Sequence, residues 1–232
     1  MVAVDLRPDA LLWAAGRDDV VCLIGDVSAE ATNATAVEAA LSAWGRLDVA
    51  LLNAGTVGSP AFEAAGAIER FDEVLAVNLR SVALGIRCAA PAIRTTGTDG
   101  AIVATASTSG FGGDPGNWAY NASKAGVINL IRAAAIDYAV HGVRINAVAP
   151  GPTETGMTRG LQRLPDIHRA MARRVPMQRW GAASEIAEAM WFLASPAASF
   201  ITGVTIAVDG GLSASAGHFD LPSNPNSREI EG

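Results

Sequence analysis

The chain has 232 residues, half of them hydrophobic and 17% charged, which is enough apolar material for a buried core and argues against a disordered chain. A net charge of −6 and an isoelectric point near 5.0 argue against nucleic acid or an anionic membrane as the main partner. No apolar run has the length of a transmembrane helix, and the N-terminus lacks the pattern of a signal peptide. We therefore expect a cytoplasmic protein whose two cysteines, Cys22 and Cys88, are reduced core residues.

The first half of the chain alternates predicted strands with predicted helices. Strand 2–5 (VAVD) is followed by a short helix over 9–16, with Pro8 near its start and Gly16 as its end. Strand 20–24 (VVCLI) precedes a helix over 28–45, for which Ser28 is the predicted cap and Gly45 the predicted end. Strand 48–52 leads into a long helical region over 68–95.

The second half continues the same alternation. It contains strand 101–106, helix 118–140, strand 143–149, helix 184–193 and strand 204–209. The strands are continuous apolar runs, which is typical of parallel strands covered on both faces. We predict an α/β fold with a Rossmann-like, doubly wound parallel sheet as one domain over residues 1–212, followed by a polar extension over 213–232.

The most informative segment is 107–126, STSGFGGDPGNWAYNASKAG. Tyr120 and Lys124 are four residues apart in a helical pattern, so their side chains share one helix face. A nearby ammonium lowers the pKa of a tyrosine toward the range of general acid–base catalysis. Ser107 ends a predicted strand, where ligands bind in open α/β sheets, and its hydroxyl can bond a substrate carbonyl. On its own, however, the Tyr120–Lys124 spacing is common on ordinary helix surfaces.

Four further motifs accompany this segment in order along the chain: LLNAG at 51–55, AVNLRS at 76–81, RINAVAPGPTETGM at 144–157 and ITGVTIAVDGG at 201–211. With them, the chain resembles the short-chain dehydrogenase/reductase family in its shorter, single-domain form, over nearly its whole length. The resemblance implies an oxidoreductase that transfers a hydride between a nicotinamide cofactor and a secondary alcohol or its ketone.

The resemblance also implies four catalytic residues. Tyr120 is the acid/base at the substrate oxygen, and Lys124 lowers its pKa and binds the nicotinamide ribose. Ser107 orients the substrate carbonyl or hydroxyl, and Asn78 holds a water in a proton relay. From the residues alone, Asn78 can also be a satisfied buried amide without a catalytic role.

A cofactor-binding set follows from the same resemblance. The loop against the adenosine side is formed by Asn53, Ala54 and Gly55, and the pair beside the adenine by Asp26 and Val27. The segment beside the nicotinamide amide includes Pro150, Gly151, Thr153 and Thr155, while Tyr120 and Lys124 complete the set. The alternatives are that Asp26 caps the next helix together with Ser28, and that Thr153 and Thr155 cap the helix that starts near Met157.

Asp5 determines the expected cofactor. A carboxylate at the end of this strand accepts hydrogen bonds from both ribose hydroxyls and repels a 2′-phosphate, so we expect NAD rather than NADP. Arg7 is the opposing signal, because an arginine at this place can accommodate that phosphate.

Aligned by its motifs, the chain begins at the second strand of the family. We therefore expect the first strand and its glycine-rich cofactor loop, the first βα unit, to be absent, which would leave an N-terminally truncated sheet with strands 2–5 and 20–24 separated from strand 48–52. The glycine-rich segment 110–116 is not a substitute, because Pro115 occupies the place of the third glycine and the segment leads into the Tyr120 helix.

The sequence does not distinguish whether four residues line a substrate pocket or form core or subunit contacts: Trp118, Met157, Leu161 and Trp180. The basic run 171–179 is expected to be a solvated face or the edge of a substrate lid. His168 and His218 have no partners at metal spacing, so no metal is expected. Family resemblance suggests a homotetramer or dimer that packs through the helices of Asn78 and Tyr120. The alternative to an enzyme is a non-catalytic or cofactor-poor relative, or a fragment, that acts as an oligomer or binding partner.

Overall fold

The computed structural model describes residues 1–96, 100–216 and 221. His218 and most of the predicted polar extension lie outside these residues. The strands are β1 Val2–Asp5, β2 Val21–Ile24, β3 Val49–Leu52, β4 Gly100–Thr105, β5 Val143–Pro150, β6 Thr153–Glu154, β7 Gly181–Ala182 and β8 Thr205–Val208. The α-helices are α1 Glu30–Trp44, α2 Ala67–Leu75, α3 Ser81–Thr95, α4 Trp118–Ala139, α5 Arg159–Gln162, α6 Pro165–Arg174 and α7 Ala183–Ala194. The short helix after β1 is a 3₁₀ helix over Pro8–Ala14.

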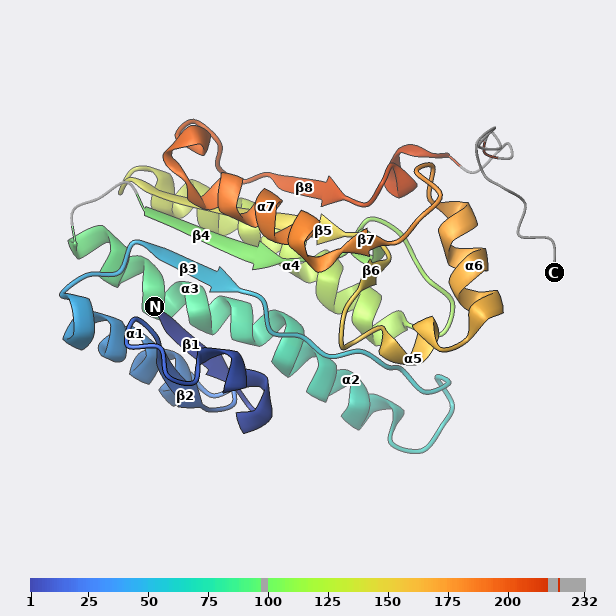
Figure 1. Cartoon of the computed structure of the whole chain (residues 1–232), viewed down its shortest axis with the longest axis horizontal. Coiled ribbons are helices and arrows are strands. Elements are labelled where there is room, and N and C mark those ends of the chain that lie inside the picture. The colour runs from blue at the N-terminus through green and yellow to red at the C-terminus, as the bar shows by residue number, and fades with distance from the viewer. Residues whose placement is uncertain (97–99, 217–220, 222–232) are drawn as a thin grey trace.

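The main sheet has four parallel strands in the order β3–β4–β5–β8, with helices on both faces (Figure 1). One face packs on α3 and α4 through a large cluster that includes Ile102, Ile131 and Ile145. The other face packs on α7 through Val103 and Leu193. Since β4 and β5 are covered on both sides, nearly every residue in them is buried, which explains their continuous apolar sequence. The α/β, Rossmann-like prediction is confirmed.

The first two strands form a separate parallel sheet. β1 pairs with β2 from Val2↔Val21 to Asp5↔Ile24, and within the described ranges neither strand forms a ladder with β3 (Figure 1). One row of β2 side chains is uncovered, so Cys22 is exposed, and the prediction that both cysteines are core residues is wrong. The chain's first element is β1, and the absence of a preceding βα unit stays a prediction.

The long helical region is continuous from α2 to α3 but passes through one π-helical turn at Ala76–Arg80. By length and composition alone, Ala67–Thr95 could cross a membrane, with a mean hydropathy of 1.3 over its most apolar window. Half of that window is buried inside the molecule, where α3 packs on β4 and α1, so we assign it as a core helix. The π-turn contains Asn78, which it directs into the interior.

Helix ends show which local predictions were right. Gly45 ends α1 in the left-handed conformation (φ 70°), as its position predicts. Ser28 is not the cap of α1, because the helix begins one residue later than expected, with Ala29 at the N-cap. The end of α7 is closed by a buried arginine from β5. Arg144 Nη1 donates to Leu193 O, and Nη2 donates to the next two carbonyls of the chain.

Candidate active site

Three of the predicted catalytic side chains meet beyond the carboxyl end of β4. Ser107 follows that strand by two residues and is buried, while Tyr120 and Lys124 come from the first two turns of α4. The packing of α4 on β5 holds these turns beside the strand end. This is the edge of an open α/β sheet at which ligands bind.

Tyr120 is mostly buried, and two neighbours act on its hydroxyl. Burial raises the pKa of Tyr120, since the phenolate loses its hydration, and the Asp114 carboxylate raises it as well. A hydrogen bond with Ser107 opposes both by stabilising the phenolate. The net direction is upward, which is contrary to the sequence prediction that Lys124 brings this pKa down.

Lys124 explains the difference. Its Nζ donates to Thr105 O at 2.7 Å and lies 5.7 Å from the centre of the Tyr120 ring. The side chain is only 3% exposed, and burial lowers the pKa of Lys124 from 10.5 to about 8. One hydrogen bond uses one of three ammonium protons. Among the described residues the other two have no hydrogen-bond partner, so the site holds a buried cation with spare donors.

Asn78 ties three segments together. Its Oδ1 accepts from Thr56 N at 2.7 Å, and its Nδ2 donates to Thr56 O at 2.9 Å and to Ser123 Oγ at 3.0 Å. Ser123 in turn donates to Tyr120 O. The buried amide is therefore satisfied by protein groups, which favours the structural interpretation of its side chain.

The loop between Ser107 and α4 is organised by Asp114. Its carboxylate accepts from Ser109 Oγ, and its backbone carbonyl accepts from Asn121 Nδ2 at 3.1 Å and from Asn117 N at 3.3 Å. These bonds place a negative charge within range of the Tyr120 hydroxyl. Nothing in the sequence pattern distinguished Asp114 from an ordinary loop residue.

Gly55 lies against the same cluster. A Cβ atom at Gly55 would lie 3.4 Å from Asn78 Oδ1, 3.7 Å from Lys124 Nζ and 3.9 Å from the Met157 methyl group. The neighbouring Asn53 and Ala54 are exposed, and Asn53 Oδ1 accepts from Thr105 Oγ1 at 2.8 Å. An open backbone beside spare ammonium donors fits the hydroxyls of a ribose, so the described residues suit the nicotinamide half of the expected cofactor.

The residues expected on the adenosine side come from the separate β1–β2 sheet. Asp5 Oδ1 accepts from Arg7 N at 2.8 Å, and the Arg7 Nε lies 4.0 Å away in an exposed ion pair. Asp26 Oδ1 accepts from Ser28 N in a turn before α1, and Val27 O accepts from Asn33 Nδ2. Asp26 therefore shapes the turn without capping α1.

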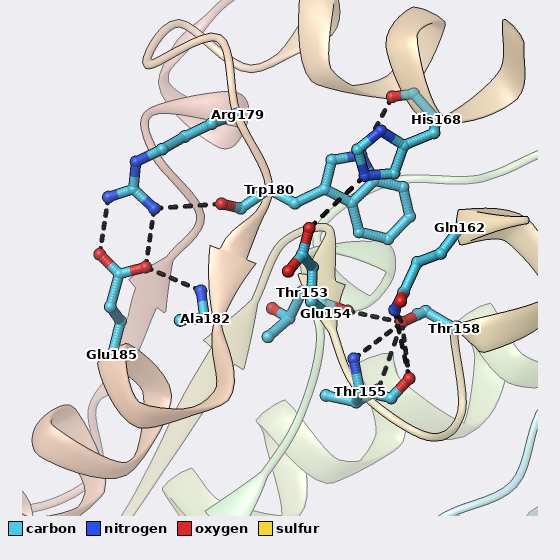
Figure 2. Close-up of polar contacts among 10 residues, drawn as sticks. All are labelled: Thr153, Glu154, Thr155, Thr158, Gln162, His168, Arg179, Trp180, Ala182 and Glu185. Atoms are coloured by element: carbon cyan, nitrogen blue, oxygen red, sulfur yellow. Dashed lines mark hydrogen bonds and ion pairs between the residues drawn. The ribbon is translucent and has the colours of Figure 1, made fainter. Parts of the chain in front are cut away.

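In the segment after β5, hydrogen bonds join the side chains and backbone of nearby polar residues (Figure 2). Gly151 packs so closely on Asp209 that a Cβ would lie 2.9 Å from its Cα, and Pro150 O accepts from Thr108 Oγ1. Thr153 is buried and donates to Gly151 O at 2.9 Å. Thr155 is not a helix cap, because its N–H donates to Thr158 Oγ1, which precedes α5.

Three short elements here, β6, α6 and β7, were not predicted from the sequence, whereas α5 begins two residues after Met157, near where a helix was expected. Figure 2 shows how polar contacts hold them. The His168 ring of α6 stacks on Trp180 at 4.9 Å and faces the Glu154 carboxylate at 3.6 Å. A forked pair between Arg179 and Glu185 then joins the following segment to α7, and this arginine lowers the pKa of Glu185 to about 2. The first part of the basic run 171–179 therefore lies in α6, and its last residue, Arg179, forms the ion pair with Glu185.

The four residues that the sequence could not assign to a pocket, the core or a subunit contact lie in different environments. Trp180 is buried against His168 and is a core residue. Met157 and Leu161 are exposed, and the Met157 methyl reaches the Gly55–Lys124 cluster. Trp118 stacks with Phe62 at 4.3 Å and with Phe71 at 5.4 Å.

Comparisons with known proteins agree with the fold. Residues 6–213 match a family described as enoyl-(acyl carrier protein) reductase. The 2-(R)-hydroxypropyl-CoM dehydrogenase of Xanthobacter autotrophicus is 36% identical over 92% of this chain and 88% of its own length. The crystal structure of levodione reductase superposes with a TM-score of 0.82 at 33% identity, covering 92% of this chain and 88% of that one. A structure titled ElxO with NADP bound gives a TM-score of 0.83 at 25% identity over 92% and 88% of the two chains.

Proposed function

The chain belongs to the short-chain dehydrogenase/reductase family, oxidoreductases that act on alcohols and ketones, and we propose that it transfers a hydride between NAD(H) and a secondary alcohol or its ketone. One observation carries the proposal. Tyr120, the buried Ser107 and the buried ammonium of Lys124 meet at the carboxyl edge of a parallel sheet.

The protein's own part in ketone reduction is proton donation and orientation. The Tyr120 O–H bond breaks, its proton goes to the substrate oxygen, and Ser107 holds that oxygen by a hydrogen bond. The cofactor, when bound, supplies the hydride to the carbonyl carbon. Because burial raises the pKa of Tyr120, the hydroxyl stays protonated at neutral pH, which suits the proton-donating direction. In alcohol oxidation the tyrosine accepts the same proton.

Lys124 and Asp5 are the residues that we assign to the two riboses. The spare donors of Lys124 bind the nicotinamide ribose, and the second carboxylate oxygen of Asp5, the one that does not accept from Arg7 N, binds the adenosine ribose hydroxyls. Asn53, Ala54, Gly55, Asp26 and Val27 complete the adenosine side, and Pro150, Gly151, Thr153 and Thr155 the amide side. NAD is the proposed cofactor because the Asp5 carboxylate repels a 2′-phosphate, although a relative with NADP bound has the same fold.

In the proposed proton relay, Asn78 has an indirect role, because it positions the segments that it is bonded to. Its side chain holds the Gly55–Thr56 backbone against α4, so it keeps the relay groups in position. We also propose a cytoplasmic homotetramer or dimer. A groove lined by Leu75, Leu79, Gly126 and Leu130 runs between the helices that contain Asn78 and Tyr120, and it can accept the same helices of another subunit.

A second candidate is a cofactor-poor binding protein, and the divided sheet favours it. β1 and β3 each have an edge without a ladder partner among the described residues. A cofactor pyrophosphate needs backbone N–H donors at a helix N-terminus beside a continuous sheet, and the divided sheet does not provide that continuity. A further strand between them, from a longer form of the protein or another chain, would join both parts.

Calorimetric titration with NADH separates the two candidates. Micromolar binding by the 232-residue chain, together with turnover of cyclic and linear secondary alcohols, supports the enzyme. A folded chain that neither binds NADH nor oxidises any alcohol of the panel contradicts it. The same titration on a version extended upstream in the genomic reading frame tests whether added residues restore binding.

A further inference from the structure

Helix α4 begins without a cap of its own. Its N-cap residue, Asn117, makes no side-chain hydrogen bond to the first turn, within the residues described. A helix leaves its first N–H groups without intrahelical partners, so they need acceptors from elsewhere. Tyr120 is the third residue of this helix, and its place depends on how that turn is held.

The missing acceptor comes from 60 residues earlier in the chain. Ser59 Oγ accepts from Ala119 N at 3.0 Å, at the second position of the helix. The next residue in the loop also contacts α4, because Pro60 O accepts from Trp118 Nε1 at 2.8 Å. The Trp118 ring stacks on Phe62, with the planes 19° apart, and this contact adds packing to the two hydrogen bonds.

The loop that provides these groups is itself fixed at its other end. Thr56 N and O are both bonded to the buried Asn78 amide, and Arg70 Nη2 donates to Val57 O. Residues 56–60 therefore form a short brace between the Gly55 backbone and the first turn of α4. Lys124, one turn farther along, is held independently by Thr105 O.

We propose that Ser59 is a positioning residue, which caps α4 from the loop after β3 and holds the Tyr120 hydroxyl against Ser107. This inference rests on the proposed function. It goes beyond that function because Ser59 contacts no group that we assign to substrate or cofactor. Without the cap, the first turn frays, and Tyr120 moves relative to Ser107 while Lys124 stays in place.

Tyr120 can be observed without a substrate. The chain contains only two tyrosines, Tyr120 and Tyr138, so in a Tyr138→Phe background ultraviolet difference titration reports Tyr120 alone. In that background, Ser59→Ala is expected to shift the Tyr120 pKa, because a displaced tyrosine changes both its burial, which raises the pKa, and its interaction with Ser107, which lowers it. Where the wild-type chain turns over a substrate, kcat falls about tenfold, the size expected for a lost cap, and KM changes little.

Three variants make the test specific. Ser59→Thr keeps the hydroxyl and is expected to restore most of both values. Trp118→Phe removes the hydrogen bond to Pro60 and keeps a smaller ring for the stack on Phe62, and it is expected to change them in the same direction by less. Ser195→Ala removes a serine cap remote from α4, in which Ser195 Oγ accepts from Ala197 N at 3.3 Å at the start of the short 3₁₀ helix after α7, and is expected to change neither.

Two results would overturn the inference: a Ser59→Ala variant with the parent's Tyr120 pKa and kcat, or a loss that Ser195→Ala shares. A wild-type chain without activity contradicts the proposed function, and the titration of Tyr120 still decides on the role of Ser59.

Discussion

The Lys124 ammonium lies over the ring of Tyr120, 5.7 Å from its centre, while its hydrogen bond goes to the carbonyl of Thr105. The lysine is thus fixed to β4 and is held at a defined height above the tyrosine. Within the described part of the chain this buried positive charge forms no ion pair with a carboxylate, and the cost of burial appears as the lowered pKa of Lys124.

Replacement of this lysine should stabilise the protein while it abolishes activity. Its pKa is 10.5 when unfolded and about 8 when folded, so the burial cost is fully present below pH 8 and disappears as pH rises toward 10.5. The difference corresponds to about 3 kcal/mol, offset by about 1 kcal/mol for the lost hydrogen bond. Lys124→Met should therefore raise the free energy of unfolding by about 2 kcal/mol at pH 7 and by less at pH 10. Urea unfolding at both pH values measures this, and an equal change at both contradicts it.

Tyr120→Phe should remove turnover and leave NADH binding nearly unchanged. The ring and its packing stay, and only the hydroxyl that exchanges a proton with the substrate is lost. Steady-state rates with the best substrate, together with a calorimetric titration, measure the two properties separately. Tyr138→Phe is the matched control, since it removes the chain's other phenol. A Tyr120→Phe enzyme with the wild-type rate would exclude this residue as the acid/base.

Asp114→Asn should move the pH profile to lower pH. The carboxylate raises the pKa of Tyr120, so loss of its charge lowers that pKa. For ketone reduction, which needs the protonated tyrosine, the decline of kcat/KM at alkaline pH should begin earlier. The amide keeps an acceptor for Ser109 Oγ. Ser109→Ala removes that bond but keeps the charge, and an identical shift in both variants would point to a rearranged loop as the cause.

Asp5→Ala should weaken NADH binding and reduce discrimination against NADPH. A charged hydrogen bond to a ribose hydroxyl contributes about 1.5–3 kcal/mol, which is about tenfold to a hundredfold in Kd. The exposed carboxylate of Asp18, changed to alanine, controls for the loss of surface charge. Titrations with both cofactors measure the effect. If Asp5→Ala leaves both dissociation constants as they were, the ribose assignment is wrong.

Arg144→Met should destabilise the protein without altering the chemistry. The guanidinium donates to the last carbonyls of α7, far along β5 from the catalytic residues, and the truncation leaves these acceptors unsatisfied. We expect a loss of about 2–4 kcal/mol in the free energy of unfolding. The kcat of the folded fraction should be unchanged. Urea unfolding and active-site titration measure both, and a stable variant with a lowered kcat would contradict this prediction.

The sequence predicted the elements that are defined by local patterns. The apolar runs gave the strands, and the four-residue spacing correctly placed Tyr120 and Lys124 on one face of α4. The direction of the Tyr120 pKa was wrong, because burial depends on the whole packed core and sequence distance shows only that an ammonium is near. The Ser59 cap was also beyond prediction, since it joins groups 60 residues apart.

Short polar helices and strands were the other elements that the sequence pattern did not predict. Helix α6 is rich in charge and contains no buried residue, so its sequence resembles a solvated loop. The strands β6 and β7 have two residues each, too few for a periodic pattern. Their positions follow from contacts such as His168 on Trp180, which only the folded chain brings together.

Because the sheet is in two parts, we expect the β1–β2 unit and the central core to unfold at different free energies. β4 and β5 lie in the buried centre, whereas the β1–β2 pair packs on α1, which in turn contacts α3 through pairs such as the exposed one between Glu30 and Arg87. Such a unit opens by local unfolding at a lower free energy than the core. A ligand that binds Asp5 and Lys124 together would bridge both units, so part of its binding energy would be used to suppress that opening.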